Sequence, residues 1–174
     1  MAEANWGEFE DEADRGRAYV VFRLGGEGYA LEVMRVREVL DVAKLTAVPG
    51  GPPALRGVLN LRGKVVPVWD LRVTFGLAVG PPTSGHDACV LMVDSSPDGA
   101  GEFRASGLLV ERVSDVIDFP PEDIQPSPQI GLGLVTPYVR GLIRHRESFL
   151  LVLDVDLVFA TLLGASASLL ALEE

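Results

Sequence analysis

Cysteine and histidine, on which many catalytic and metal sites depend, are nearly missing from this sequence. Cys89 is the only cysteine, and His86 and His145 are the only histidines among 174 residues. A single cysteine excludes a disulfide within the chain and a metal site built from several thiolates. Neither histidine lies in an HExxH pattern, and no Walker motif or complete dinucleotide fingerprint is present. We therefore expect neither a metal nor a cofactor.

Positive charge is also scarce. Fifteen lysines and arginines face 25 acidic residues, which gives a formal net charge of −10, and only Lys44 and Lys64 are lysines. A nucleic-acid surface needs clustered positive charge, so no nucleic-acid partner is expected. No apolar run approaches the roughly 20 residues that span a bilayer, and the N-terminus lacks the features of a signal peptide. The sequence thus predicts a cytoplasmic protein without direct membrane insertion.

Acidic charge gathers at the N-terminus. Residues 1–17 contain six acidic side chains and few apolar ones, which predicts an acidic disordered tail. Trp6 and Phe9 leave open that this tail docks somewhere. From Ala18 onward short apolar runs begin, and together with 19 glycines and 12 prolines they favour a β-rich fold over a helical bundle.

Most of the remaining chain is duplicated. The stretch RGVLNLRGKVVPVWDLRVTFG at 56–76 returns 84 positions later, at 140–160, as RGLIRHRESFLLVLDVDLVFA. Likewise YALEVMRVREVLD at 29–41 matches SGLLVERVSDVID at 106–118, with an offset of 77. We infer two internal repeats of approximately 18–76 and 88–160, joined by a segment rich in proline and glycine and followed by a C-terminal helical extension at 161–174.

Each repeat offers about five short strands, and the copied stretch predicts a hairpin because two β-rich runs flank a turn. We expect an all-β fold of two five-stranded barrels related by a pseudo-two-fold axis, with a groove between them. The run at 29–42 is interpreted as a bent strand, with a helical turn around 33–36 as the alternative. Which repeat supplies each closing strand stays open, and an exchange of hairpins between the barrels is compatible with the pattern.

Asp70 and Asp154 end equivalent strands of the two repeats. A duplicated β protein with one such aspartate per copy is compatible with an aspartic protease, whose paired carboxylates share a proton. However, neither aspartate is followed by the Thr/Ser-Gly pair that holds such a carboxylate. An aspartate that caps the turn after its strand is the simpler interpretation.

Two charged residues stand where a small barrel favours apolar or neutral ones. Glu38 lies within an apolar run, and Arg62 lies at the tip of the first hairpin. One interpretation is a surface ion pair worth roughly 0–1 kcal/mol. The other is a binding site, because the arginine fork fixes orientation while its stem packs. In that case both would flank an apolar stripe that receives a partner helix: Val36, Val58, Val113 and Val116.

Four stretches together resemble the CheW family of bacterial chemotaxis coupling proteins: YVVFRLGGEGYALEVMRVREVL, AVPGGPPALRGVLNLRGKVVPVWDLRVTFG, LLVERVSDVIDFPPEDIQPSP and YVRGLIRHRESFLLVLDVDLVF. The pattern GVxNLRGxVxPVxDLR is specific, and no stretch resembles a kinase or a receiver domain. The resemblance implies a CheW-like domain at 18–160 with two SH3-like barrels, and no enzymatic activity.

The resemblance also implies partners. The chain would be an adaptor that couples chemoreceptors (methyl-accepting chemotaxis proteins) to the histidine kinase CheA, recruited to membrane-associated receptor arrays. The receptor tip would lie in the groove, and the kinase's regulatory domain would dock at a barrel end. An adaptor of a non-flagellar chemosensory pathway, for surface motility or biofilm control, is the alternative. Family positions implicated in receptor contact fall on Val36, Glu38, Gly57, Asn60, Arg62, Gly63, Val113 and Val116.

Overall fold

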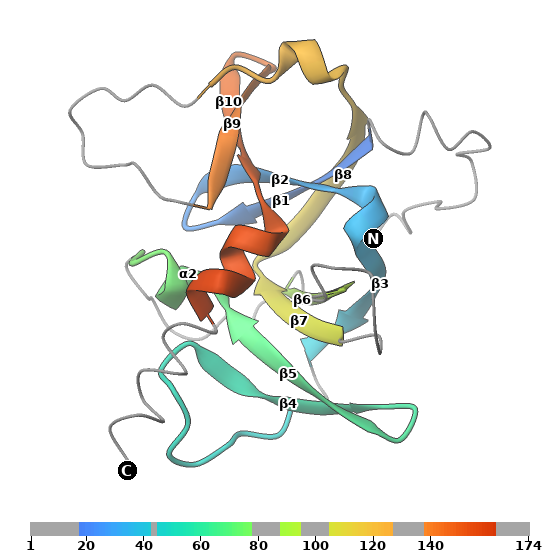
Figure 1. Cartoon of the computed structure of the whole chain (residues 1–174), viewed down its shortest axis with the longest axis vertical. Coiled ribbons are helices and arrows are strands. Elements are labelled where there is room, and N and C mark those ends of the chain that lie inside the picture. Colours follow the sequence, from blue (N-terminus) through green and yellow to red (C-terminus); the bar gives the residue numbers. More distant parts are fainter. Residues whose placement is uncertain (1–17, 43–44, 78–87, 95–104, 127–137, 163–174) are drawn as a thin grey trace.

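Short strands and tight turns make up most of the chain (Figure 1). The computed structural model describes residues 18–42, 45–77, 88–94, 105–126 and 138–162. The strands of the first repeat are β1 (Ala18–Leu24), β2 (Glu27–Glu32), β3 (Val36–Asp41), β4 (Leu55–Leu61) and β5 (Lys64–Asp70). Those of the second repeat are β6 (Cys89–Asp94), β7 (Ala105–Val110), β8 (Arg112–Asp118), β9 (Val139–His145) and β10 (Ser148–Leu153).

The helical segments are short. They are η1 (Val33–Arg35), α2 (Leu71–Thr74), η3 (Pro121–Asp123) and a helix at 155–162. The run at 29–42 forms β2, η1 and β3, so the interpretation as one bent strand was wrong and the helical-turn alternative holds. The acidic tail at 1–17 and the C-terminal extension beyond 162 lie outside the described residues.

The ten strands form two five-stranded sheets, each built from both repeats. Sheet A has the order β8-β1-β2-β10-β9, and sheet B has the order β3-β6-β7-β5-β4. Replacing every strand by its counterpart in the other repeat converts one order into the other. The all-β, SH3-like fold is confirmed, and the exchange that the sequence left open is present. The β1–β2 hairpin joins the second repeat's strands, and the β6–β7 hairpin joins the first's (Figure 1).

Each sheet keeps two edge strands. Among the described residues no ladder joins β8 to β9 or β3 to β4, so closed barrels are not formed by strand pairing alone. The chain instead returns beside each hairpin and makes an isolated bridge, Thr46 to Val58 in sheet B and Gln125 to Leu142 in sheet A. In each sheet, one edge strand is therefore bridged by a residue that lies outside the named strands.

Three hydrophobic clusters explain why so many strands are apolar on both faces. In β1, Tyr19 and Val21 pack in a cluster inside sheet A, whereas Val20 and Phe22 pack in a cluster shared by the two sheets. This alternation follows from the period of two along a strand. Sheet B has its own cluster, which contains Leu59, Val66, Val68, Val90, Met92 and Leu109. Each sheet therefore has its own core, and a third core joins them.

The two copied hairpins have the same register. In β4–β5, Leu61 pairs with Lys64 and Asn60 with Val65; the pairs of β9–β10 are the same after a shift of 84, including the irregularity after the first pair. Both turn residues have positive φ in each hairpin, 52° and 83° at Arg62 and Gly63, and 48° and 64° at Arg146 and Glu147. These are the angles of the tight turns that match the twist of paired strands.

Candidate functional site

The tip of the β4–β5 hairpin and strand β3 meet through one ion pair. Arg62 Nη2 lies 3.5 Å from Glu38 Oε2, with side chains 80% and 30% exposed. The side-chain oxygen of Asn60 accepts a hydrogen bond from the Gly63 amide at 3.0 Å, which fixes the turn that carries Arg62. Since β3 and β4 are the edges of sheet B, the ion pair spans its opening. At this exposure the pair contributes roughly 0–1 kcal/mol.

The four valines of the predicted stripe lie deeper, on strands β3, β4 and β8, and Val58 is half-buried in β4. Val36 is 9% exposed and belongs to the shared cluster, and Val113 packs against that cluster from β8. Val116 is half-buried in β8, opposite Val20 of β1. The structure thus places Val36 and Val113 at the junction of the sheets, while the polar residues lie on the surface of sheet B.

Gly57 has a packing reason of its own. A Cβ added there would lie 2.5 Å from the backbone oxygen of Thr46, which real Cβ atoms do not approach. Gly141, its counterpart, would meet the backbone oxygen of Gln125 in the same way. Both glycines allow another segment of the chain to pass close beside the hairpin. Packing within the fold is therefore enough to explain why Gly57 is a glycine, and no contact with a receptor is needed to explain it.

Asp70 and Asp154 cap the turns after their strands, as the simpler interpretation proposed. Asp70 Oδ1 accepts from the Arg72 amide at 3.0 Å, and Asp154 Oδ1 accepts from the Leu157 amide at 3.2 Å. Asp70 also accepts from Arg72 Nε and Nη2, at 3.2 and 3.0 Å, and both side chains are buried. Hydrogen bonding to Asp70 raises the pKa of Arg72. The Asp70 carboxylate is therefore held by an arginine.

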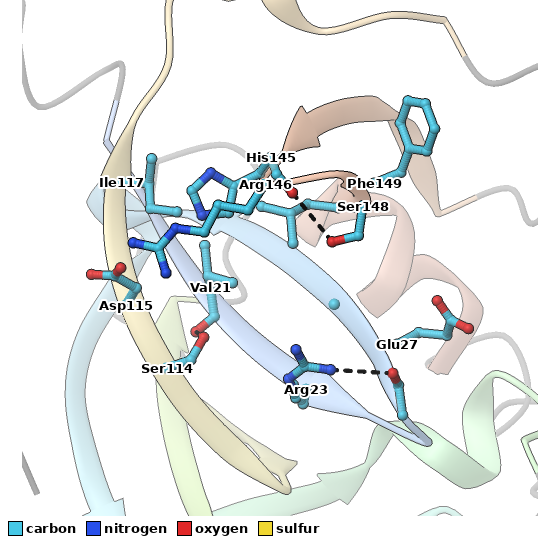
Figure 2. Close-up of a pocket in the computed structure, with 13 residues that line it drawn as sticks. Val21, Arg23, Glu27, Ser114, Asp115, Ile117, His145, Arg146, Ser148 and Phe149 are labelled. Carbon is cyan, nitrogen blue, oxygen red and sulfur yellow. Dashed lines mark hydrogen bonds between the residues drawn. The ribbon is translucent and has the colours of Figure 1, made fainter.

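A pocket of about 300 Å³ lies in sheet A, at the position that corresponds to Glu38 and Arg62 (Figure 2). The offsets of 77 and 84 place Asp115 at Glu38 and Arg146 at Arg62, and both residues line this pocket. The Arg146 side chain extends toward Asp115 in Figure 2, but the ion pairs of the described residues do not include Arg146. Sequence reasoning aligned these positions and did not predict the pocket.

Three further observations concern chemistry. Within the ranges that the structure covers, no three histidine, cysteine, aspartate or glutamate side chains gather closely enough to hold a metal ion. No helix in those ranges is long and apolar enough to cross a membrane. Cys89 is buried, and desolvation raises the pKa of its thiol to about 11, so it is protonated near neutral pH.

Known proteins are similar to this chain in sequence and in fold. A family model described as "CheW-like domain" matches residues 18–162. A chemotaxis protein CheW of Rhizobium meliloti is 33% identical over 83% of this chain and 88% of its own. The protein PilI of Pseudomonas aeruginosa is 28% identical over 79% of this chain and 72% of its own. The crystal structure of the scaffolding protein TtCheW from Thermoanaerobacter tengcongensis has a TM-score of 0.70 and 26% identity, covering 91% of this chain and 94% of that one. The chain belongs to the family of CheW-like domains.

Proposed function

We propose that this protein is a non-enzymatic adaptor that couples chemoreceptors to the histidine kinase CheA. Membership of the CheW-like family across 18–162 supports a role in chemotaxis signalling, and the similar TtCheW structure is titled a scaffolding protein. The observation that carries the proposal is the Glu38–Arg62 pair at the opening of sheet B. It offers a charged anchor at the surface of sheet B.

The chemistry of this surface suits a helical receptor tip. Arg62 is 80% exposed, and among the described residues its one ion pair is to the 30% exposed carboxylate of Glu38 at 3.5 Å, so its guanidinium is available to a partner carboxylate. Val65, in the same hairpin and paired with Asn60, is 72% exposed and offers an apolar contact. Interfaces of this kind favour an arginine beside apolar groups. Val36, Gly57, Asn60, Gly63, Val113 and Val116 complete the proposed receptor-binding set.

The proposal is tested by capturing a receptor tip fragment with the parent protein and with Arg62→Ala and Glu38→Ala. We expect each variant to fold and the Arg62 variant to lose about tenfold or more in affinity, which corresponds to roughly 1.4 kcal/mol. Arg146→Ala is the matched control because it removes the equivalent arginine of the other hairpin. If the Arg62 variant binds the tip as well as the parent and the control do, the proposed receptor surface is wrong.

A second candidate is an adaptor of a non-flagellar chemosensory pathway. The observation that favours it is the relative named PilI, since this name shows that similar chains are not all called chemotaxis proteins. Recovery of CheA and receptors after purification from the host supports the first candidate. Recovery of a different histidine kinase and its receptors supports the second.

A further inference from the structure

Two arginines, Arg23 and Arg146, line the pocket of sheet A and make no ion pair among the described residues. Arg23 lines it and donates from Nη1 to the Gly26 carbonyl at 3.3 Å. Arg112, which does not line the pocket, lies directly opposite Arg23 across the β1–β8 pair, and like charges at such positions are destabilising. Neither of them, nor Arg146, belongs to the ion pairs of the described residues. An anion bound here would relieve the repulsion.

Carboxylates of the fold do not fill this role. Glu27 and Asp115 also line the pocket, so its lining is mixed in charge (Figure 2). Asp115 Oδ1 accepts from the Val116 amide at 2.9 Å. Neither carboxylate makes an ion pair with the pocket's arginines among the described residues. The cationic positions therefore stay available to an added carboxylate.

The same pocket has an apolar wall. Phe149 is 51% exposed and extends from β10 at its rim (Figure 2). Val21, Ile117 and Leu150 line the interior beside it. Figure 2 shows the Phe149 ring directed away from Arg23 and from the Arg146 guanidinium, so the aromatic and the charged contacts lie at separate places around the pocket. An occupant that reaches both carries an aromatic side chain and acidic groups.

One segment of this chain has that composition. Residues 1–17 contain six acids together with Trp6 and Phe9. The other longer segments outside the described residues are poorer in acids: 78–87 has one, 95–104 and 163–174 have two each, and 127–137 has none. Charge complementarity therefore selects the N-terminal segment.

The attachment point brings this segment within reach. It joins the fold at Ala18, the first residue of β1, and the pocket residues Val21 and Arg23 follow in the same strand. At about 3.3 Å per residue they lie roughly 10–17 Å along the strand. The four residues from Asp14 to Ala18 span up to about 14 Å, and each earlier residue adds to this. Tethering also raises the effective concentration of the segment to about the millimolar range.

We propose that the acidic N-terminal segment binds intramolecularly in the sheet A pocket. Its carboxylates contact Arg23 and Arg146, and an aromatic ring from Trp6 or Phe9 packs on Phe149. The pocket lies in sheet A, whereas Glu38 and Arg62 belong to sheet B, so this binding does not use the charged pair of the proposed receptor surface. It shares only strand β8 with that surface, through Val113 and Val116. Because the contacts are charged and exposed, salt weakens them.

The test uses the full chain and ¹H–¹⁵N NMR at low salt. One variant neutralises the segment with Glu8→Gln, Glu10→Gln, Asp11→Asn, Glu12→Gln and Asp14→Asn; a second carries Arg23→Gln and Arg146→Gln. We expect the first variant to shift the pocket amides of Gly26, Gly28, Ser114 and Ser148. We expect the second to shift the amides of residues 6–14. Added salt should produce both sets of shifts in the parent. Arg56→Gln, on β4 of sheet B, is the matched control and should leave the segment unchanged.

Two results would overturn the proposal. One is that neutralising the segment leaves the pocket amides unshifted, while unfolding curves show the variant to be folded. The other is that the shifts spread evenly over both sheets, which indicates a diffuse charge effect. Neither result bears on capture of the receptor tip by Arg62, so this proposal and the proposed function fail separately.

Discussion

Arg72 and Asp156 occupy equivalent positions of the two repeats, 84 residues apart, yet they carry opposite charges. Arg72 Nη1 lies 3.8 Å from Glu111 Oε1, and Asp156 Oδ1 lies 2.8 Å from Arg35 Nη2. Glu111 lies between β7 and β8, and Arg35 lies between β2 and β3, where the chain passes from one sheet to the other. Each of these two connections between the sheets thus forms an ion pair with the opposite repeat. The connection carries the positive charge at Arg35 and the negative charge at Glu111.

The buried pair of Asp70 and Arg72 should dominate the electrostatic contribution to stability. Their side chains are 1% and 5% exposed, so Asp70→Asn leaves a buried guanidinium with only the more distant carboxylate of Glu111, at 3.8 Å. Breaking such a pair costs about 3–5 kcal/mol. Urea unfolding measures this loss, and Arg62→Ala serves as an exposed control with a loss below about 1 kcal/mol. Equal losses in the two variants would contradict the assignment.

The Arg35–Asp156 pair should contribute much less. Its side chains are 25% and 46% exposed, so solvent and salt screen the attraction. A double-mutant cycle with Arg35→Ala and Asp156→Ala should give a coupling energy of about 0.5–1 kcal/mol that falls as salt is added. A coupling that does not change with salt would indicate that contacts other than charge hold this crossing.

The exchange of hairpins predicts that neither repeat folds alone. In sheet A the β1–β2 hairpin pairs with β8 and β10, which both belong to the second repeat. A fragment ending at residue 80 therefore lacks both neighbours of this hairpin, and two strands alone are marginal in water. We expect the fragments 1–80 and 81–174 to show no cooperative unfolding separately and to recover it when mixed. Cooperative unfolding of either fragment alone would show that the repeat is a folding unit.

Gly57→Ala should destabilise the protein through a clash with backbone. The added methyl group would lie 2.5 Å from the Thr46 oxygen, which is fixed by hydrogen bonds between Thr46 and Val58. Overpacking of this kind costs about 1–3 kcal/mol. Gly28→Ala is the control, because its added methyl meets only the tip of the Leu150 side chain, which can rotate away. Thermal unfolding compares them, and a larger loss at Gly28 would contradict the explanation.

Cys89 should make stability fall at alkaline pH. Burial raises the pKa of the folded thiol from 9.0 to about 11, so the unfolded chain loses this proton first. The thiol's stabilising contribution is therefore complete below pH 9 and is lost as pH rises through about 11, in total about 3 kcal/mol. Tyr19, Tyr29 and Tyr138, whose pKa values are also raised by burial, act in the same direction. The contribution of the thiol is measured by comparing the unfolding free energy of the parent and of Cys89→Ala from pH 8 to 11. If the two curves of free energy against pH run parallel, the thiol does not cause the loss of stability.

Local structure followed closely from the sequence. The repeat at an offset of 84 predicted two equal hairpins, and the structure gives them the same pairs and the same positive-φ turns. The aspartate caps were also predicted, since a carboxylate after a strand accepts from nearby amides. Among the candidate site residues, Glu38 and Arg62 form the surface ion pair that one of the two interpretations predicted. A role for them in receptor binding stays a prediction.

The sequence by itself determined the repeats, the hairpins and the alternation of buried side chains, because these depend on neighbours within a few residues. The tertiary structure alone decided which repeat's strands share a sheet, and hence that the pocket of sheet A lies among β1, β2, β8 and the β9–β10 turn. The physical reason is that the apolar pattern of a strand specifies that a face is buried and leaves its partner strand unspecified. With two nearly equal copies, either could supply that partner, and the crossings at η1 and Glu111 direct the chain to the other sheet.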